Sequence, residues 1–379
     1  MPMTQSISRL YIGLMSGTSL DGVDGVLAAM PADGAQSPIQ TMASAYIPFP
    51  AALRRDLMSL QAVSDNELHH EALAANTLAR HYAECVTQLL QQSGMQRETI
   101  TAIGAHGQTI RHRPEAGYTR QTNNPALLAE LTGIDVIADF RSRDIAAGGQ
   151  GAPLVPAFHR AVFGKAGETR IVANIGGIGN ISVLTNNEET IGFDTGPGNV
   201  LMDAWIAQHH GKTYDADGAW AASGMIVPDL LTALLNEPYF MLSPPKSTGR
   251  DLFHPAWLAK KLAGFSHAAP ADVQATLAAF TATTLANAIT AHASEAKSVY
   301  VCGGGAYNAY LMRQLRDALT DRNHMASVQS TEALGISPNH VEALAFAWLA
   351  QRHVERKPGN LPSVTGAKGL RILGALYPA

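Results

Sequence analysis

The sequence has few cysteines and no long run of basic residues. Its 379 residues include only Cys85 and Cys302, which lie far apart and form neither a disulfide framework nor a zinc-binding spacing. A formal charge of −4 and a pI near 6.4 argue against a protein that binds nucleic acid or a membrane surface through its charge. We therefore expect its partner to be a small molecule.

The chain also lacks a segment typical of membrane or secreted proteins. Polar residues interrupt the longest apolar stretches well before the roughly 20 residues that span a bilayer. Residues 1–4 show no basic region followed by an apolar one, as a secretory signal would. Because the cysteines are also sparse, we expect a cytoplasmic protein.

Length and composition favour two domains. At 379 residues and 46% hydrophobic, the chain is long for one domain and rich enough in apolar residues to bury substantial cores. The glycines at 164 and 167 mark the best candidate boundary. We expect an N-terminal lobe over residues 1–165 and a C-terminal lobe over residues 166–379, with a cleft between them.

A pattern of strand, glycine loop and strand occurs once in each half of the chain. In the first copy, the apolar run 10–15 precedes the turn-rich segment 16–22 and a second apolar run at 23–27. In the second copy, residues 171–175 precede a glycine loop at 176–180 and another apolar run at 181–184. The recurrence indicates duplication at the scale of a domain.

Loops of this kind can hold phosphate groups, because consecutive N–H groups without a Cβ leave room for an anion. Taken alone, either loop could equally be a plain hairpin turn. Neither contains the lysine of a Walker A loop, and neither opens a helix as a dinucleotide-binding loop does. The remaining candidate is an α/β, two-lobed actin-like (ribonuclease H-like) ATPase fold with duplicated domains and an interlobe cleft. A third glycine run, Gly303 to Gly305, would then contact the adenosine.

Several other elements can be predicted from apolar periodicity. One face of residues 68–90 is apolar, which predicts a long amphipathic helix, and further helices are expected at 308–319 and 341–354. Strands are expected at 100–105 and 134–138, each followed by a polar cluster. In α/β folds, ligands gather where strands end.

Asp194 is the best candidate for a general base. It ends an apolar strand and is followed by a Gly-Pro-Gly turn and a helix that begins near Leu201. Phosphoryl transfer needs a carboxylate that can accept a proton from the attacking group. An Asp that merely caps the following turn remains the alternative interpretation.

The remaining polar candidates have weaker support. His106 and Gln108 are suited to hydrogen bonds with a polar substrate, whereas a zinc site at the histidines lacks any recognisable pattern. Asp139 and Arg143 could also contact the substrate or form a structural ion-pair cluster with Asp144. Glu342, on an otherwise apolar helix, could make a buried polar contact or a ligand contact.

Five motifs together resemble those of the anhydro-N-acetylmuramic acid kinase family. They run in order along the chain, from about Tyr11 to the segment 374–377, and comprise 13–22, 105–109, 174–177, 194–199 and 302–305. The resemblance implies that ATP phosphorylates O6 of 1,6-anhydro-N-acetylmuramic acid while water opens the 1,6-anhydro bridge. The product would be N-acetylmuramic acid 6-phosphate, an intermediate of murein recycling.

The resemblance also implies roles for individual residues. Asp194 takes the general-base position. Apart from the resemblance, Arg143 or a neighbouring backbone N–H could bind the lactyl carboxylate of the sugar. The implied ATP contacts are Gly17, Thr18, Ser19, Leu20, Asp21, Gly22, Val23, Asp24, Gly176, Gly177, Gly303, Gly304, Gly305 and Asn308. The implied sugar contacts are His106, Gln108, Asp139, Arg143, Gly196, Asn199 and Glu342.

The family resemblance further implies Mg²⁺ as a cofactor and a homodimer as the assembly. Related actin-like proteins commonly have an Asp in each phosphate loop, but here Met15 and Ser16 occupy the first position and Asn174 the second. Asp21, Asp24 or water could hold the metal instead, since Mg²⁺ needs only one or two carboxylates.

Three other functions remain open from the sequence. A kinase for an ordinary hexose or amino sugar would use Asp194 to deprotonate a substrate hydroxyl directly. An ATP-gated chaperone or filament protein would hydrolyse ATP regardless of sugar. A phosphatase or a glycoprotease on the same fold is more remote.

Overall fold

A computed structural model describes residues 8–17, 19–32, 38–187 and 189–379, and it divides the chain into two compact units. The first unit consists of residues 1–158 and 340–379, and the second of residues 159–339. The division falls within helix α5 (Val155–Phe163), slightly before the predicted boundary at 165.

The segment from His340 to the C-terminus belongs to the first unit, whereas the prediction assigned it to the second lobe. The reason is that its helix α11 (Val341–Val354) packs against strands of the first sheet.

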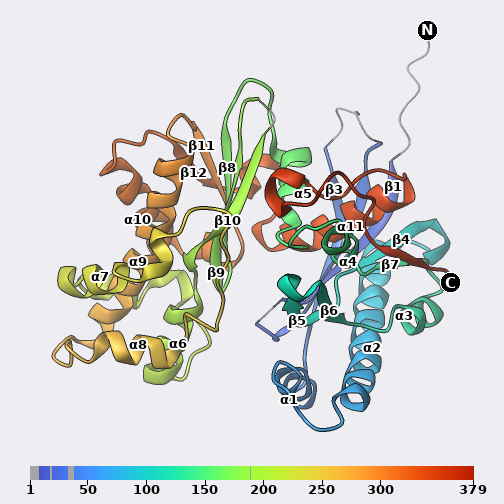
Figure 1. The fold of residues 1–379 in the computed structure, drawn as a ribbon, viewed down its shortest axis with the longest axis horizontal. Helices are drawn as coiled ribbons and strands as arrows, with labels where there is room; N and C mark the ends of the chain where they lie inside the picture. Colours follow the sequence, from blue (N-terminus) through green and yellow to red (C-terminus); the bar gives the residue numbers. More distant parts are fainter. Residues whose placement is uncertain (1–7, 18, 33–37, 188) are drawn as a thin grey trace. The chain divides into compact units, whose positions relative to one another are not determined.

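A six-stranded sheet, in the order β13-β7-β4-β1-β2-β3, forms the centre of the first unit (Figure 1). The first three strands of the chain are antiparallel neighbours, and β4 and β7 continue the sheet parallel to β1. The C-terminal strand β13 closes the edge by pairing antiparallel with β7. The strands are β1 (Arg9–Met15), β2 (Gly22–Met30), β3 (Gln40–Pro48), β4 (Ile100–Ala105), β7 (Val136–Ala138) and β13 (Ala375–Tyr377).

Two long helices cover opposite faces of this sheet. A Cβ added to Gly25 would meet Cys85 of α2 (Glu67–Ser93), whereas one added to neighbouring Gly13 would meet the backbone of α11 at Ala343. The rest of the unit comprises a small hairpin and short helices: β5 (Gln108–Arg113), β6 (Tyr118–Thr122), α1 (Ala51–Ser59), α3 (Pro125–Thr132), α4 (Ser142–Ala146) and α12 (Pro362–Thr365).

The second unit has a five-stranded sheet in the order β10-β9-β8-β11-β12. Its first three strands are antiparallel neighbours, and the next two run parallel to the first, as in the first unit. The strands are β8 (Arg170–Ile175), β9 (Ile178–Leu184), β10 (Thr190–Pro197), β11 (Ser298–Cys302) and β12 (Ser327–Ser330). The repeated strand order confirms the duplicated actin-like (ribonuclease H-like) fold that the sequence predicts.

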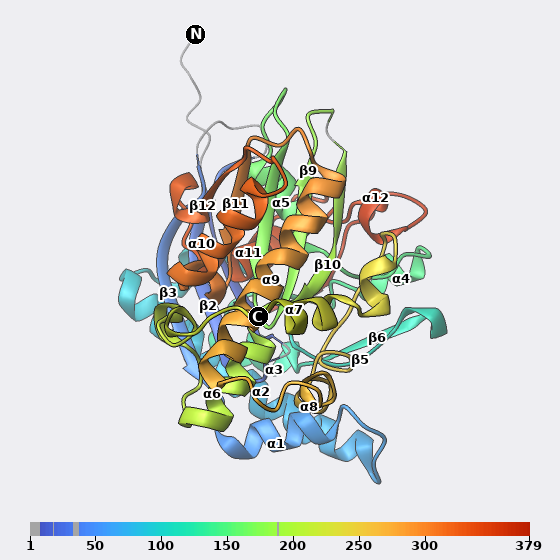
Figure 2. The ribbon, with the colours of Figure 1, turned by 90° about the vertical axis from the view of Figure 1, so that its left-hand side faces the viewer.

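Helices α9 and α10 lie side by side over one face of the second sheet (Figure 2). Helix α9 is buried along nearly its whole length, because small residues such as Ala278 and Ala282 let its neighbours approach closely. The helices of this unit are α6 (Val200–His210), α7 (Pro228–Leu235), α8 (Pro255–Leu262), α9 (Pro270–His292) and α10 (Ala309–Thr320).

Most predicted elements agree closely with the observed ones. Strand β4 and helix α11 have the predicted bounds, and α2 confirms the long amphipathic helix, although its predicted core residue Leu68 is 87% exposed. Both cysteines are buried, and neither forms a disulfide within the described part of the chain. Across the described residues, no helix is both long and apolar enough to cross a membrane.

Candidate active site

The first glycine loop connects β1 to β2. Leu20 has a positive φ of 56° and donates its N–H to the carbonyl of Gly17 at 3.3 Å. The Ser19 hydroxyl donates to Oδ1 of Asp21 at 2.6 Å. A Cβ on Gly17 would meet nothing closer than Ser19 Oγ at 3.8 Å, so the backbone at Gly17 is open to a ligand. Thr18, which was also predicted to contact ATP, lies outside the described residues.

The second glycine loop is shorter than predicted. Gly179 and Asn180 belong to β9, where they pair with β8 and β10, so that only Gly176 and Gly177 form the turn. A Cβ on either turn residue would meet nothing closer than 3.8 Å. This turn therefore presents open backbone, as the loop at Gly17 does.

The third glycine run combines packing with an open position. A Cβ on Gly303 or Gly305 would come within 2.4 Å or 2.3 Å of Asn174 Oδ1 or Ile175 Cγ2, so both glycines are required for packing against β8. Gly304 between them is exposed. Asn308 is largely buried, and its side chain caps α10 by accepting from the N–H of Leu311 at 2.9 Å.

Three carboxyl groups gather near the start of β2 and of α11. Burial, followed by the charges of Asp21 and Glu342, raises the pKa of Asp24 to about 7, although its side chain keeps an exposed surface. Burial also raises the pKa of Glu342, whereas Arg141 lowers it. A cation bound here would relieve the repulsion among these carboxylates. Gly22 and Val23, between Asp21 and Asp24, are buried by packing against β3 and the core.

His106 and Gln108 anchor the first loop from β4 and β5. The Nδ1 of His106 lies 3.3 Å from the carbonyl of Ser16, and its Nε2 accepts from Arg141 Nη2 at 2.9 Å. Because a carbonyl can only accept, Nδ1 carries the proton. Burial, together with the charge of Arg141, lowers the pKa of His106 to about 3, so the ring is neutral.

Gln108 is fully buried and donates through Nε2 to the carbonyl of Gly17 at 3.0 Å. Its Oε1 has no hydrogen-bond partner among the residues that the structure describes. The hydroxyl of Ser16 donates to the carbonyl of Gly107 at 3.0 Å, so the loop is held from both sides of this segment. Both polar residues predicted at the end of β4 therefore position the loop backbone.

The polar cluster after β7 is more dispersed than predicted. Asp139 accepts from the Ser142 hydroxyl at 2.5 Å, and Arg143 lines a pocket with His353 and residues near the C-terminus. Asp144 is fully buried and accepts from Asn360, Thr365 and the N–H of Gly151. It ties the C-terminal segment to α4, so the structure gives Asp144 a structural role.

In the second unit, Asp194 lies on β10 at an irregularity of the strand. Pairing with β9 shifts register between Asp194 and Gly196, a bulge of the kind that often redirects side chains near functional sites. The N–H of Thr248 donates to Asp194 Oδ2 at 3.0 Å, and the Tyr239 hydroxyl donates to the Asp194 carbonyl at 2.7 Å. Burial raises the pKa of Asp194 to about 6, and the Thr248 N–H opposes this rise.

Gly196 and Asn199 shape the turn that follows Asp194. Gly196 has a φ of 143°, and a Cβ on it would approach the Phe240 ring at 2.9 Å. Asn199 donates through Nδ2 to the carbonyl of Ile175 at 3.2 Å, and its N–H donates to the carbonyl of Gly176 at 2.8 Å. These contacts join the turn to the second glycine loop.

Two residues of the site were missed by sequence reasoning. Arg141 fixes His106, and Thr248 contacts Asp194 from a loop that is distant along the chain. The loop around Thr248 is rich in Pro, Ser and Gly, which marks an irregular segment but not its target. The described residues contain no group of three or more His, Cys, Asp or Glu side chains arranged to hold a metal ion.

Comparison with known proteins identifies the family. The family model for anhydro-N-acetylmuramic acid kinase matches residues 9–379. An anhydro-N-acetylmuramic acid kinase of Cupriavidus pinatubonensis is 60% identical over 375 residues, covering 97% of this chain and 98% of that protein. An anhydro-N-acetylmuramic acid kinase of Burkholderia orbicola (strain MC0-3) is 58% identical over 370 residues, covering 97% of this chain and 96% of that protein. The chain belongs to the anhydro-N-acetylmuramic acid kinase family.

More distant solved structures match this family member over most of its length. The ROK family glucokinase from Streptomyces griseus, in complex with glucose and AMPPNP, has 13% identity and a TM-score of 0.43, and covers 90% of this chain and 99% of its own. The activator of the 2-hydroxyisocaproyl-CoA dehydratase from Clostridium difficile, with bound ADPNP, has 13% identity and a TM-score of 0.46. The match covers 92% of this chain and 96% of the activator chain.

Proposed function

We propose that this chain converts 1,6-anhydro-N-acetylmuramic acid, ATP and water to N-acetylmuramic acid 6-phosphate and ADP. The observation that carries the proposal is the match of the kinase family model to residues 9–379. In this substrate O6 is part of the anhydro bridge and has no proton to give. A base must therefore activate water rather than the phosphate acceptor.

Asp194 has the properties that this base requires. With a pKa near 6 it is mostly ionised at neutral pH, yet it accepts a proton more readily than an ordinary Asp. We propose that Asp194 accepts a proton from the water that attacks C1 of the sugar. The C1–O6 bond then breaks, and O6 attacks the γ-phosphorus while ADP leaves.

The open backbone at Gly17, Gly176, Gly177 and Gly304 supports contacts with ATP, because no Cβ stands in the way of an anion. Mg²⁺, when bound, would neutralise the negative charge of the ATP phosphates. Asp21 and Asp24 would hold such a cation, since both residues are exposed and the charge of Asp21 raises the pKa of Asp24. For Asn308, Gly303 and Gly305 we propose a supporting role in the adenosine loop.

For the sugar, we propose contacts with Gln108, Asp139, Gly196, Asn199 and Glu342. Gln108 is the strongest of these candidates, because its buried Oε1 has no donor among the described residues, and a buried acceptor without a donor costs free energy until a ligand supplies one. His106 already uses both ring nitrogens within the protein, so we propose that it positions the loop. The cytoplasmic location rests on the sequence features described above and the homodimer on the family resemblance, and both remain predictions.

The decisive experiment is an ADP-release assay with the anhydro sugar, run on wild type, Asp194→Asn and the control Asp229→Asn. Asp229 is an exposed residue in the first turn of α7. Mass spectrometry should find both phosphate and water added to the sugar by wild type and control. Loss of the base should reduce kcat at least about 10²-fold.

Two other results would redirect the assignment. ADP release that is indifferent to sugar would favour a generic ATPase. Faster turnover of the ring-opened sugar than of the anhydro sugar would favour an ordinary amino-sugar kinase. In either case the proposed reaction would be wrong.

A further inference from the structure

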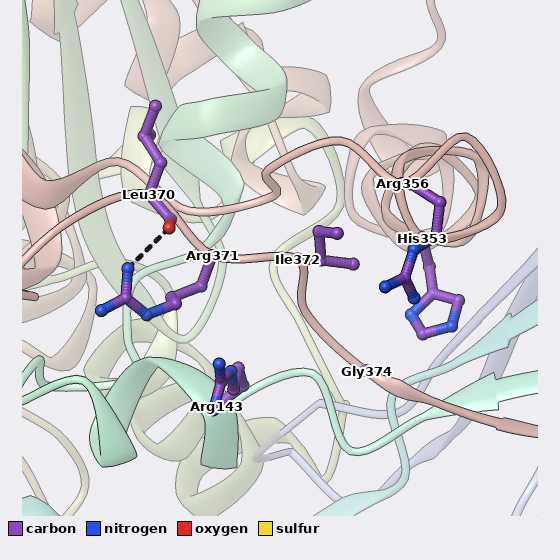
Figure 3. A pocket seen from close by; sticks show the side chains of 7 residues that line it. All are labelled: Arg143, His353, Arg356, Leu370, Arg371, Ile372 and Gly374. Carbon is purple, nitrogen blue, oxygen red and sulfur yellow. Dashed lines mark hydrogen bonds between the residues drawn. The ribbon is translucent and has the colours of Figure 1, made fainter.

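A cationic pocket lies entirely within the first unit. It has a volume of about 520 Å³, and none of the described residues that line it is acidic. Its basic side chains come from three segments: Arg143 from α4, His353 from the last turn of α11 with Arg356 just after that helix, and Arg371 from the segment that leads to β13 (Figure 3). Leu370, Ile372 and Gly374 complete the lining.

The charges in this pocket are not neutralised by neighbouring carboxylates. Arg371 donates through Nη1 to the carbonyl of Leu370 at 2.8 Å, and it forms no ion pair with an acidic side chain of the described residues. Within the described part of the chain, the guanidinium groups of Arg143 and Arg356 have no recorded ion pair or hydrogen bond. Two nearby carboxylates are engaged elsewhere, Asp144 with Asn360 and Thr365, and Glu355 with Lys357.

His353 adds a further polar atom to the pocket. Its Nδ1 lies 2.8 Å from the carbonyl of Leu373, so this nitrogen carries the proton and donates. The other ring nitrogen, Nε2, has no recorded partner among the described residues.

Two residues that line the pocket, Arg356 and Gly374, have backbone conformations that most residues rarely adopt. Arg356 has a positive φ of 57°, a left-handed conformation at the end of α11 that favours glycine or asparagine over arginine. Gly374 has a φ of 85°, and a Cβ on it would come within 2.7 Å of Ile137. The backbone conformation at these two positions therefore helps to keep the basic residues close together.

We propose that this pocket binds a small phosphorylated metabolite at a site separate from the ATP phosphates. Guanidinium groups match phosphate oxygens with paired hydrogen bonds, and a phosphate monoester carries nearly two negative charges at neutral pH. The volume is within the range of small-molecule sites. Glu342, which lies with Asp21 and Asp24, is eleven residues before His353 on α11, or roughly 16 Å along the helix axis. This binding site is an addition to the proposed kinase reaction, because that reaction does not require a second phosphate site.

Inorganic phosphate is the probe for a test by isothermal titration calorimetry. The titration uses the full chain with saturating ADP and Mg²⁺, at constant ionic strength, so that the nucleotide site is occupied. The pocket variant is Arg356→Ser with Arg371→Ser. The control is Arg55→Ser with Arg80→Ser, which removes the same charge from exposed positions of α1 and α2 in the same unit.

Wild type and control should bind phosphate with equal affinity, and the pocket variant should bind at least about tenfold more weakly. When phosphate is added to wild type, the ring signals of His353 in NMR spectra should shift, and the midpoint of this shift should match the phosphate affinity from calorimetry. Equal affinity in all three proteins, or no saturable binding by wild type, would overturn the proposal. An increased KM of Arg143→Ala for the anhydro sugar, with phosphate binding unchanged, would instead assign the pocket to the sugar. Unchanged thermal unfolding of each variant excludes misfolding as the cause.

Discussion

The main-chain N–H of Thr248 donates to Oδ2 of Asp194 at 3.0 Å, and the N–H of Asp194 donates to the carbonyl of Lys246 at 3.3 Å. The loop that contains Thr248 thus borders β10 where the proposed base lies. Burial raises the pKa of this carboxyl to about 6, and the hydrogen bond from the Thr248 N–H acts in the opposite direction.

The pKa of Asp194 predicts how activity depends on pH. Below about pH 6 the carboxyl is protonated and cannot accept a proton from water, so kcat should fall toward tenfold per pH unit on the acid side. Above this pH the rate should reach a plateau until another group titrates. Initial rates between pH 4.5 and 8.5, at saturating ATP and sugar, measure this profile.

Asp24 provides the control for this assignment, because its pKa of about 7 is also raised. Asp24→Asn should retain the acid inflection even if its kcat is lower. If the inflection disappears in Asp24→Asn, the titrating group is Asp24 rather than Asp194.

Close packing between β1 and α11 predicts a large effect of Gly13→Ala. The new Cβ would stand 1.8 Å from the carbonyl oxygen of Ala343 and 2.7 Å from the N of Ala347, and both are backbone atoms that cannot rotate away. We expect a loss of about 1–3 kcal/mol or more in the free energy of unfolding, measured by chemical denaturation. Gly264→Ala is the control, because a Cβ there meets nothing within 4 Å. Equal stability of the two variants would contradict the packing.

The environment of His106 predicts its protonation state. Between pH 5 and 9 the ring should stay neutral with the proton on Nδ1, because Arg141 donates to Nε2 and burial disfavours the charged form. NMR of the ring nitrogens measures the tautomer and its titration, with a histidine-containing peptide in the same sample as reference. A titration of His106 within this range would show that the contact with Arg141 is absent in solution.

The buried carboxylate of Asp144 predicts that Thr365→Val destabilises the C-terminal segment. The Thr365 hydroxyl donates to Asp144 Oδ1 at 2.8 Å, and valine has a similar shape without the donor. Loss of a hydrogen bond to a charged group should reduce the free energy of unfolding by about 1.5–3 kcal/mol. Hydrogen exchange of residues 360–366 should increase as well.

Thr87→Val is the matched control for that experiment, since the Thr87 hydroxyl donates to a carbonyl on an exposed face of α2. It should change the free energy of unfolding by less than about 0.5 kcal/mol. A similar small change in Thr365→Val would argue that Asp144 does not hold the C-terminal segment.

Local patterns in the sequence predicted most of the secondary structure and the main candidates of the site. The apolar run at 100–105 and the apolar periodicity at 341–354 correspond to β4 and α11, because burial on a sheet or helix face leaves a repeating signature. The repeated glycine loops likewise indicated a duplicated fold, and Asp194 stood out because apolar residues precede it and a glycine-rich turn follows; in the structure it lies within β10, which continues to Pro197.

Contacts between distant segments could not be read from those patterns. No local signal places α11 on β1 or Thr248 beside Asp194, and the separations of such pairs along the chain carry no information about their distance in space. The sequence also suggested Arg143 as a substrate contact, whereas in the structure Arg141 holds His106 and Arg143 faces a cationic pocket.

The sequence by itself determined the strands, the helices, the glycine loops and the family resemblance, because each depends on residues that are neighbours along the chain. Only the tertiary structure decided which polar groups are already satisfied and which remain open to a ligand. His106 and Gln108 illustrate the difference: both looked equally available in the sequence, but packing uses both ring nitrogens of the histidine and leaves one buried oxygen of the glutamine without a partner among the described residues.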